Sequence, residues 1–112
     1  MEKSNEHKQA WRGGDSGVKY MFRGPRLDWG LVKFKPGEEL GAHYHKAVEE
    51  TFYFPAGAPR MIIAGNDARV EPGDAFRVEP GEIHNIINDT DSDVTAIFIK
   101  CPFDPNDKVA AK

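Results

Sequence analysis

Short runs of β-branched and aromatic residues, each bounded by turn-forming residues, restrict the fold of this chain more than any other feature. Glycine, proline and asparagine supply the turns, as in Pro36-Gly37, Pro72-Gly73 and Gly65-Asn66-Asp67. Evidence for helices is almost absent. The pattern predicts strands over Val18–Arg23, Trp29–Lys35, Ala42–Lys46, Glu50–Phe54, Arg60–Ala64, Ala68–Val70, Ala75–Val78, His84–Asn88 and Val94–Lys100.

Strands that recur roughly every 8 to 12 residues without intervening helices are typical of an all-β sandwich or barrel. The length of 112 residues fits one domain. We expect an amino-terminal arm over residues 1–14, a single barrel over residues 15–101 and a carboxy-terminal tail over residues 102–112. The arm bears Trp11, and Phe103 is the residue that would anchor the tail.

Composition and charge exclude several kinds of partner. Fifteen basic and eighteen acidic residues are spread over the chain, so no basic field exists to bind nucleic acid. No apolar run is long enough for a membrane span, and Met1–Ser16 lacks the apolar core of a signal peptide. The single cysteine, Cys101, cannot form an internal disulfide and is expected to be buried near a strand end. We therefore expect a cytoplasmic protein.

His43 and His45 are two residues apart in a predicted strand. Side chains with this spacing point to the same face, with Cα atoms about 6.6 Å apart. Two imidazoles so placed need only tilt to share one metal ion, which histidine nitrogen binds at about 2.0 to 2.2 Å. The pair therefore predicts half of a metal site.

A carboxylate must come from a neighbouring strand, and Glu49 and Glu50 are the two candidates. If Glu50 faces inward, Phe52 and Phe54 share its face and line an apolar interior. The other register would bury Tyr53 and expose two phenylalanines. We therefore predict Glu50 as the ligand. His84 follows the Pro80-Gly81 turn on a distant strand and is the predicted third imidazole.

These residues form two motifs that resemble those of the cupin superfamily. The first is Gly, five residues, His-x-His, four residues, Glu, six residues, Gly, and the second is Gly, then Pro-Gly, two residues, His, three residues, Asn. In this chain Pro80 directly precedes Gly81, where the family has one residue between them. The resemblance covers roughly Trp29–Lys100 and rests on Gly37, His43, His45, Glu50, Gly57, Gly73, Gly81, His84 and Asn88.

The resemblance implies an antiparallel jelly-roll barrel, also called a double-stranded β-helix, in which His43, His45, Glu50 and His84 hold one divalent transition metal ion. Nitrogen and oxygen donors without sulfur suit Fe, Mn, Ni, Co or Zn, so the donor set leaves the metal open. Four protein ligands leave positions on an octahedral ion for water or a chelating substrate, and such a site is typical of catalysis.

We therefore expect a metal-dependent enzyme that acts on a small oxygen-rich molecule by chelation, as a dioxygenase, isomerase or decarboxylase does. Two alternatives stay open. One is a small-molecule binding or sensing module without turnover. The other is a metal-free, epimerase-like barrel in which His43 or His84 acts as general base.

Predicted substrate contacts are Phe52, Phe54, Asn88 and Arg60, chosen as aromatic or polar side chains on the strands of the barrel. Tyr53 and Arg77 were the other polar candidates, and Arg77 is expected to point outward. Barrels of the cupin superfamily commonly pair through sheet edges and an amino-terminal arm, so the resemblance also implies a homodimer.

Overall fold

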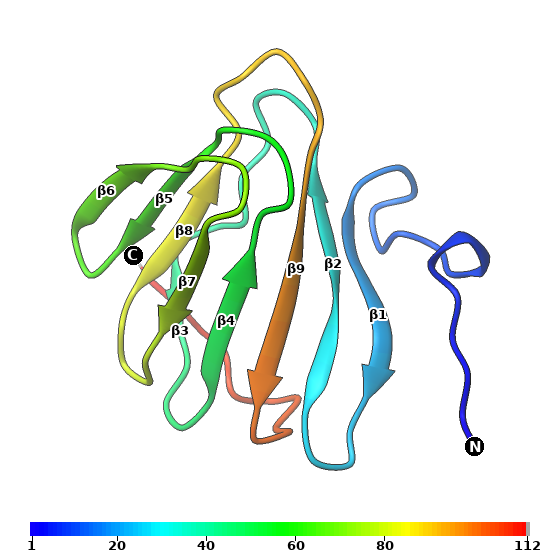
Figure 1. Cartoon of the computed structure of the whole chain (residues 1–112). Coiled ribbons are helices and arrows are strands. Elements are labelled where there is room, and N and C mark those ends of the chain that lie inside the picture. Colours follow the sequence, from blue (N-terminus) through cyan, green and yellow to red (C-terminus); the bar gives the residue numbers. More distant parts are fainter. Residues whose placement is uncertain (112) are drawn as a thin grey trace.

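The computed structural model describes residues 1–111 and consists of strands apart from one short 3₁₀-helix, η1 (Glu6–Lys8) (Figure 1). The strands are β1 (Gly17–Arg23), β2 (Asp28–Phe34), β3 (His43–Tyr44), β4 (Glu49–Tyr53), β5 (Arg60–Ile63), β6 (Asn66–Arg69), β7 (Ala75–Val78), β8 (His84–Ile87), β9 (Val94–Cys101) and β10 (Val109–Ala110). Within the described residues, no helix is long and apolar enough to span a membrane.

The strands form two five-stranded antiparallel sheets, ordered β1-β2-β9-β4-β7 and β10-β3-β8-β5-β6. Non-consecutive neighbours such as β2 and β9, or β3 and β8, show that the chain crosses repeatedly between the sheets. This confirms the predicted all-β, antiparallel jelly-roll class.

The core lies between the sheets and follows from strict alternation along the longer strands. In β2 and in the first five residues of β9, every second residue is buried, and β4 buries Glu50 and Phe52 while Tyr53 is 41% exposed. Phe98 of β9 pairs directly with Phe52 of β4. The predicted register of β4 is therefore confirmed, and it places Glu50 on the core face.

Three local features differ from the sequence predictions. The tail contributes β10, which pairs with β3 through Val109↔Tyr44 and Ala110↔His43. The register of β1 shifts between Tyr20 and Phe22, as in a β-bulge. Cys101 is exposed, contrary to the predicted burial, because it is the last residue of β9 and the chain leaves the barrel there.

The amino-terminal arm lies beside β1 (Figure 1). Lys19 explains this placement: its Nζ donates to the Glu6 carbonyl at 2.7 Å and lies 4.0 Å from the centre of the Trp11 ring. Cation–π contact with a tryptophan ring is the strongest of its kind. The arm therefore packs on its own barrel.

Gly30 of β2 lies where the bulged strand β1 comes closest, and we expect Gly30→Ala to lower the free energy of unfolding. A Cβ at Gly30 would lie 2.1 Å from the Lys19 carbonyl oxygen, a backbone atom that cannot move without breaking the β1–β2 pairing. Overpacking of this kind costs about 2 kcal/mol. Chemical denaturation would measure it. Gly37→Ala is the control, because a Cβ at Gly37 would meet open space and only the positive φ of 86° would strain the alanine.

Candidate metal centre

The four predicted ligands converge at the barrel interior. His43 lies on β3, and His45 directly follows this strand. Glu50 lies on β4 and His84 on β8, and His84 is the cross-strand partner of His43. All four side chains are buried, and one donor atom from each lies within 4.8 Å of the others. Donors of an ion with bonds of about 2.1 Å are at most about 4.2 Å apart, so small side-chain adjustments suffice.

Backbone carbonyls orient all three imidazoles. The Nδ1 atom of His43 donates to Gly41 O at 2.8 Å, that of His84 to Glu82 O at 3.0 Å, and that of His45 to Asp107 O. A proton held on Nδ1 leaves Nε2 as the lone-pair donor in neutral imidazole. Such outer-shell hydrogen bonds are what fix the tautomer of metal-binding histidines.

The Nε2 atoms of His45 and His84 face the same carboxylate oxygen. His84 Nε2 is fully buried without a hydrogen bond and lies 3.4 Å from Glu50 Oε1, while His45 Nε2 lies 3.1 Å from the same oxygen. A carboxylate oxygen facing two nitrogen lone pairs needs a proton or a cation between them, since buried polar groups without partners are costly. One divalent ion would satisfy all four donors, so the residues fit a metal.

The same contacts shift the pKa values of the ligands. Burial lowers the pKa of His43 to about 4. Burial also opposes the charge of His45, but contact with the Glu50 carboxylate and the Asp107 carbonyl outweighs it and raises the pKa of His45 above its ordinary value of 6.5. Burial raises the pKa of Glu50, yet the nearby imidazoles of His45 and His84 hold it at about 2. Without metal, the Glu50 carboxylate therefore favours the protonated form of His45.

We expect metal binding to release a proton at pH values below the raised pKa of His45, because an ion must displace the proton of His45. His45 has a raised pKa, so metal affinity is highest above that pKa and falls about tenfold per pH unit below it. His43, with a pKa of about 4, adds a second proton only near that pH. Calorimetric titration with Co(II) in buffers of different ionisation enthalpy measures the proton count. Affinity that is constant between pH 7 and pH 5 would contradict histidine ligation.

Asp107 in the tail holds the loop that carries His45. Its carboxylate accepts hydrogen bonds from three consecutive backbone N–H groups, those of Lys46 at 2.6 Å, Ala47 at 2.7 Å and Val48 at 2.9 Å. These bonds hold the pKa of Asp107 below its ordinary value against the opposing effect of burial. The Asp107 carbonyl is also the acceptor for His45, so one residue fixes both the loop and the imidazole.

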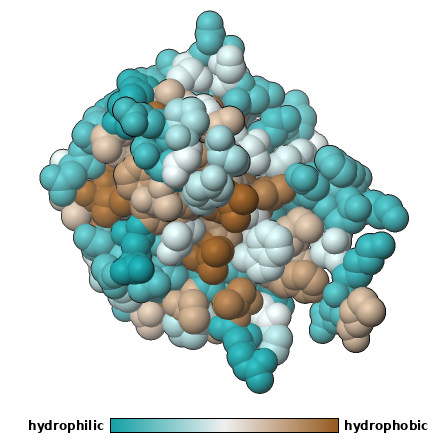
Figure 2. Space-filling view, in the orientation of Figure 1, coloured by the Kyte–Doolittle hydropathy of each residue, from teal (hydrophilic) through white to brown (hydrophobic). Residues whose placement is uncertain are grey.

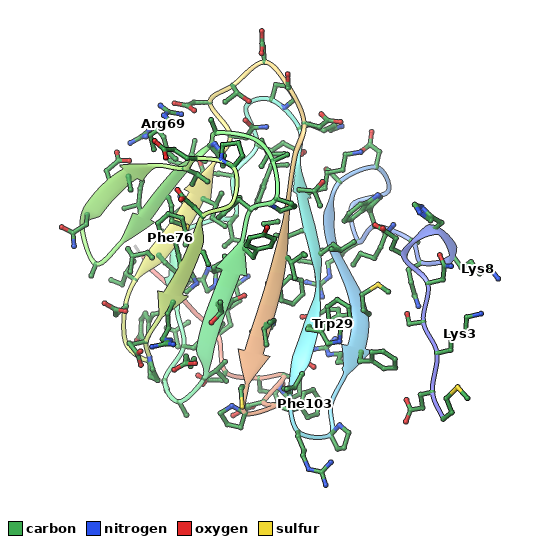
Figure 3. The ribbon with its side chains drawn as sticks, in the orientation of Figure 1. Lys3, Lys8, Trp29, Arg69, Phe76 and Phe103 are labelled. Atoms are coloured by element: carbon green, nitrogen blue, oxygen red, sulfur yellow. The ribbon has the colours of Figure 1, made fainter. Side chains whose placement is uncertain are left out.

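Phe103 anchors the same segment at its start. Its N–H donates to Arg26 O at 2.9 Å, and its ring is the nearest group to Gly24 in the β1–β2 turn, below the strands in Figure 3. The tail is thus attached at both ends, at the turn and at β10, and passes beside the metal centre between them.

A cavity of about 140 Å³ adjoins the ligands. An enclosed space of similar size accommodates a benzene-sized molecule. Besides His43, His45 and Glu50, it is lined by apolar side chains from the sheet β1-β2-β9-β4-β7 and from loops, by the tail and by a polar group made of Arg12, Tyr20, Arg23, Asp28 and Lys100. A molecule in this cavity would lie next to the ligand atoms.

The predicted substrate contacts do not all meet there. Phe52 lines the cavity, while Phe54 is fully buried in the core. Arg60 lies outside the cavity and pairs with Asp67 across the β5–β6 hairpin. The buried Asn88 amide donates to Phe34 O and Ser92 O and accepts from Thr90, so it holds loops together. Neither Arg60 nor Asn88 lines this cavity.

The fold and the four convergent donors define a jelly-roll protein with a candidate metal centre. The chain belongs to the cupin family, since the family model described as "Cupin domain" matches residues 30–100. No curated protein matches the sequence.

Solved structures share the fold over nearly the whole chain. An uncharacterized protein with a double-stranded β-helix domain from Klebsiella pneumoniae is 15% identical, with a TM-score of 0.82 and coverage of 96% of this chain and 95% of the other. KdgF from Halomonas sp. is 23% identical, with a TM-score of 0.82 and coverage of 95% and 97%. A predicted oxalate decarboxylase from Thermotoga maritima is 20% identical, with a TM-score of 0.74 and coverage of 88% and 97%.

Proposed function

We propose that the protein is a metal-dependent enzyme that binds a small oxygen-rich molecule by direct chelation at the ion held by His43, His45, Glu50 and His84. One observation carries the proposal: three of these residues also line the cavity, so a ligand in the cavity and an ion in the cluster would be in direct contact. A structural zinc site is more often closed by four ligands that include cysteine.

The bound ion would act as a Lewis acid that polarises a carbonyl or hydroxyl oxygen of the substrate. The chain's own residues supply the rest. Backbone carbonyls keep each imidazole in the tautomer that ligates, and Phe52 and Phe98 provide an apolar wall that limits water beside the reacting molecule. Metal-dependent dioxygenases, isomerases and decarboxylases that chelate an oxygen-rich substrate all stay within the proposal.

Water displacement at the ion tests the proposal. The untagged protein would be reconstituted with Mn(II), and water-proton relaxation would be followed as oxalate is added. We expect relaxation by the loaded protein to show exchangeable water that oxalate displaces. The proposal fails if the loaded protein has no exchangeable water. It also fails if saturating oxalate, and other small molecules that chelate through two oxygen atoms, leave the relaxation unchanged.

A non-catalytic binding module is the second candidate, favoured by the small cavity beside the four side chains. A ligand that raises the melting temperature and is recovered chemically unchanged would favour it over the enzyme. Activity that persists in metal-free protein would instead favour general-base catalysis by His43 or His84.

The expected homodimer and cytoplasmic location stay predictions, and sedimentation at about 12.5 kDa would exclude the dimer.

A further inference from the structure

Lys100 is a cation that the metal centre does not use. It is the half-buried inward residue near the end of β9 and lines the same cavity as the ligands. Its Nζ donates to the Tyr20 hydroxyl at 3.1 Å and forms no ion pair within 4.0 Å among residues 1–111. A half-buried ammonium group without a carboxylate partner is unusual.

The carboxylates closest to Lys100 in the sheet are committed elsewhere. Its cross-strand neighbours are Glu50 on β4 and Asp28 on β2. Glu50 faces the histidines, and Asp28 accepts a hydrogen bond from the Gly24 N–H at 3.1 Å. Asp28, Asp104 and Asp107 also line the cavity, but within residues 1–111 none of their carboxylates lies within 4.0 Å of Lys100 Nζ.

Two arginines beside Tyr20 extend this positive region toward solvent. The Arg23 guanidinium lies 4.5 Å and the Arg12 guanidinium 5.6 Å from the centre of the Tyr20 ring, and both arginines are exposed. The ring packs edge-on against Phe98 with centroids 5.5 Å apart, which fixes the direction of the hydroxyl. The hydroxyl accepts from Lys100, so its own proton is free to be donated.

We propose that Lys100 and Tyr20 form a carboxylate-binding subsite, so that the molecule chelated at the metal centre is an organic acid whose carboxylate they bind. The proposal rests on the proposed function and names its substrate class. Lys100 would supply a charge-assisted hydrogen bond and Tyr20 a neutral one to the two carboxylate oxygens. Arg23 and Arg12 would add long-range attraction at the entrance.

Two probes that differ at a single functional group test the subsite. 3,4-Dihydroxybenzoate and its methyl ester have the same vicinal hydroxyls for chelation, but only the acid has a carboxylate. Calorimetry would measure the binding of each to Co(II)-loaded wild type, Lys100→Met, Lys100→Arg and Tyr20→Phe. Lys33→Met is the matched control, because Lys33 pairs with Asp93 at 3.5 Å and lies outside this cavity.

We expect wild type to bind the acid at least about tenfold more tightly than the ester, and Lys100→Met to remove this preference, as loss of a charge-assisted hydrogen bond does. Lys100→Arg should retain most of the preference, Tyr20→Phe should reduce it, and Lys33→Met should not change it. The ester reports chelation without the carboxylate, so a misfolded variant would lose the binding of both probes. If Lys100→Met misfolds in this way, Lys100→Arg and Tyr20→Phe test the subsite.

The outcomes separate the subsite from the proposed function. The subsite is overturned if wild type binds the acid and the ester equally. It is also overturned if all Lys100 and Tyr20 variants that bind Co(II) lose affinity for both probes equally. Neither result contradicts chelation at the ion. Failure of both probes to bind any loaded protein overturns chelation, and the subsite with it.

Discussion

Glu50→Gln should reduce the affinity for a divalent ion by roughly 1,000-fold, more than the 10- to 100-fold typical of outer-shell changes. Glu50 is the only anionic ligand of the cluster, and its Oε1 lies 3.1 Å from His45 Nε2 and 3.4 Å from His84 Nε2. An amide of the same shape keeps the packing but removes the charge that offsets the ion. Competition with a chelating dye, repeated for Co(II) and Zn(II), measures the loss.

The neighbouring residue provides the control. Glu49 faces outward, is half exposed and has the Arg77 guanidinium 4.0 Å away. Glu49→Gln makes the same chemical change one residue away and should alter metal affinity less than about twofold, since exposed ion pairs contribute little. Equal losses in the two variants would mean that the ion is held elsewhere.

Asp107→Ala should lower metal affinity by about 10- to 100-fold although Asp107 is not a ligand. The change removes the acceptor of three backbone N–H groups in the loop after His45 and frees the carbonyl that orients the His45 ring. Metal-free protein should also lose about 2 kcal/mol of unfolding free energy, because buried donors are left unpaired. Calorimetric titration with Co(II), below the melting temperature of the variant, measures the affinity.

A merely structural role would leave the metal centre itself unchanged. The visible spectrum of bound Co(II) should therefore shift in Asp107→Ala and return toward wild type in Asp107→Asn, which keeps an acceptor oxygen. Asp104→Ala is the control, since Asp104 lies in the same segment and lines the cavity, but its carboxylate accepts only from Asn106 N at 3.1 Å. A destabilised Asp107→Ala protein with wild-type affinity and spectrum would refute the positioning role.

Alternation was sufficient to predict the interior of the barrel. The two-residue period places Glu50 and Phe52 inward and Tyr53 outward whatever the strand pairing, because a one-residue slip would expose the phenylalanines. The same period brings His43 and His45 to one face, and the turn before His84 brings the third imidazole beside them. Local rules thus predicted the ligands, with the family resemblance implying that they belong to one site.

The second layer of the site could not be predicted in the same way. Asp107 acts through backbone N–H groups about 60 residues earlier in the chain, and such contacts leave no periodic pattern in the sequence. The β1 bulge next to Tyr20 interrupts the alternation that would otherwise indicate which side chains of this strand enter the cavity. Lys100 is the last residue of a predicted strand, and its place two residues after Phe98 indicates an inward side chain.

Two predicted substrate contacts, Arg60 and Asn88, do not line the cavity, and the reason is shared. Both are polar residues on or next to a strand, and polarity alone does not separate a substrate contact from a structural bond. Arg60 pairs with Asp67, and Asn88 satisfies its donors and acceptor within the loops that it joins. Long-range partners decide the role of such residues, and those become visible only in the folded chain.

The central claim is that three imidazoles and one carboxylate hold a single ion. An anomalous difference map, from crystals of the untagged protein grown with excess Co(II), tests it most directly. We expect one strong peak at about 2.0 to 2.2 Å from Nε2 of His43, His45 and His84 and from a Glu50 oxygen. A map with no peak among these four side chains, or with the ion bound elsewhere on the chain, would contradict it.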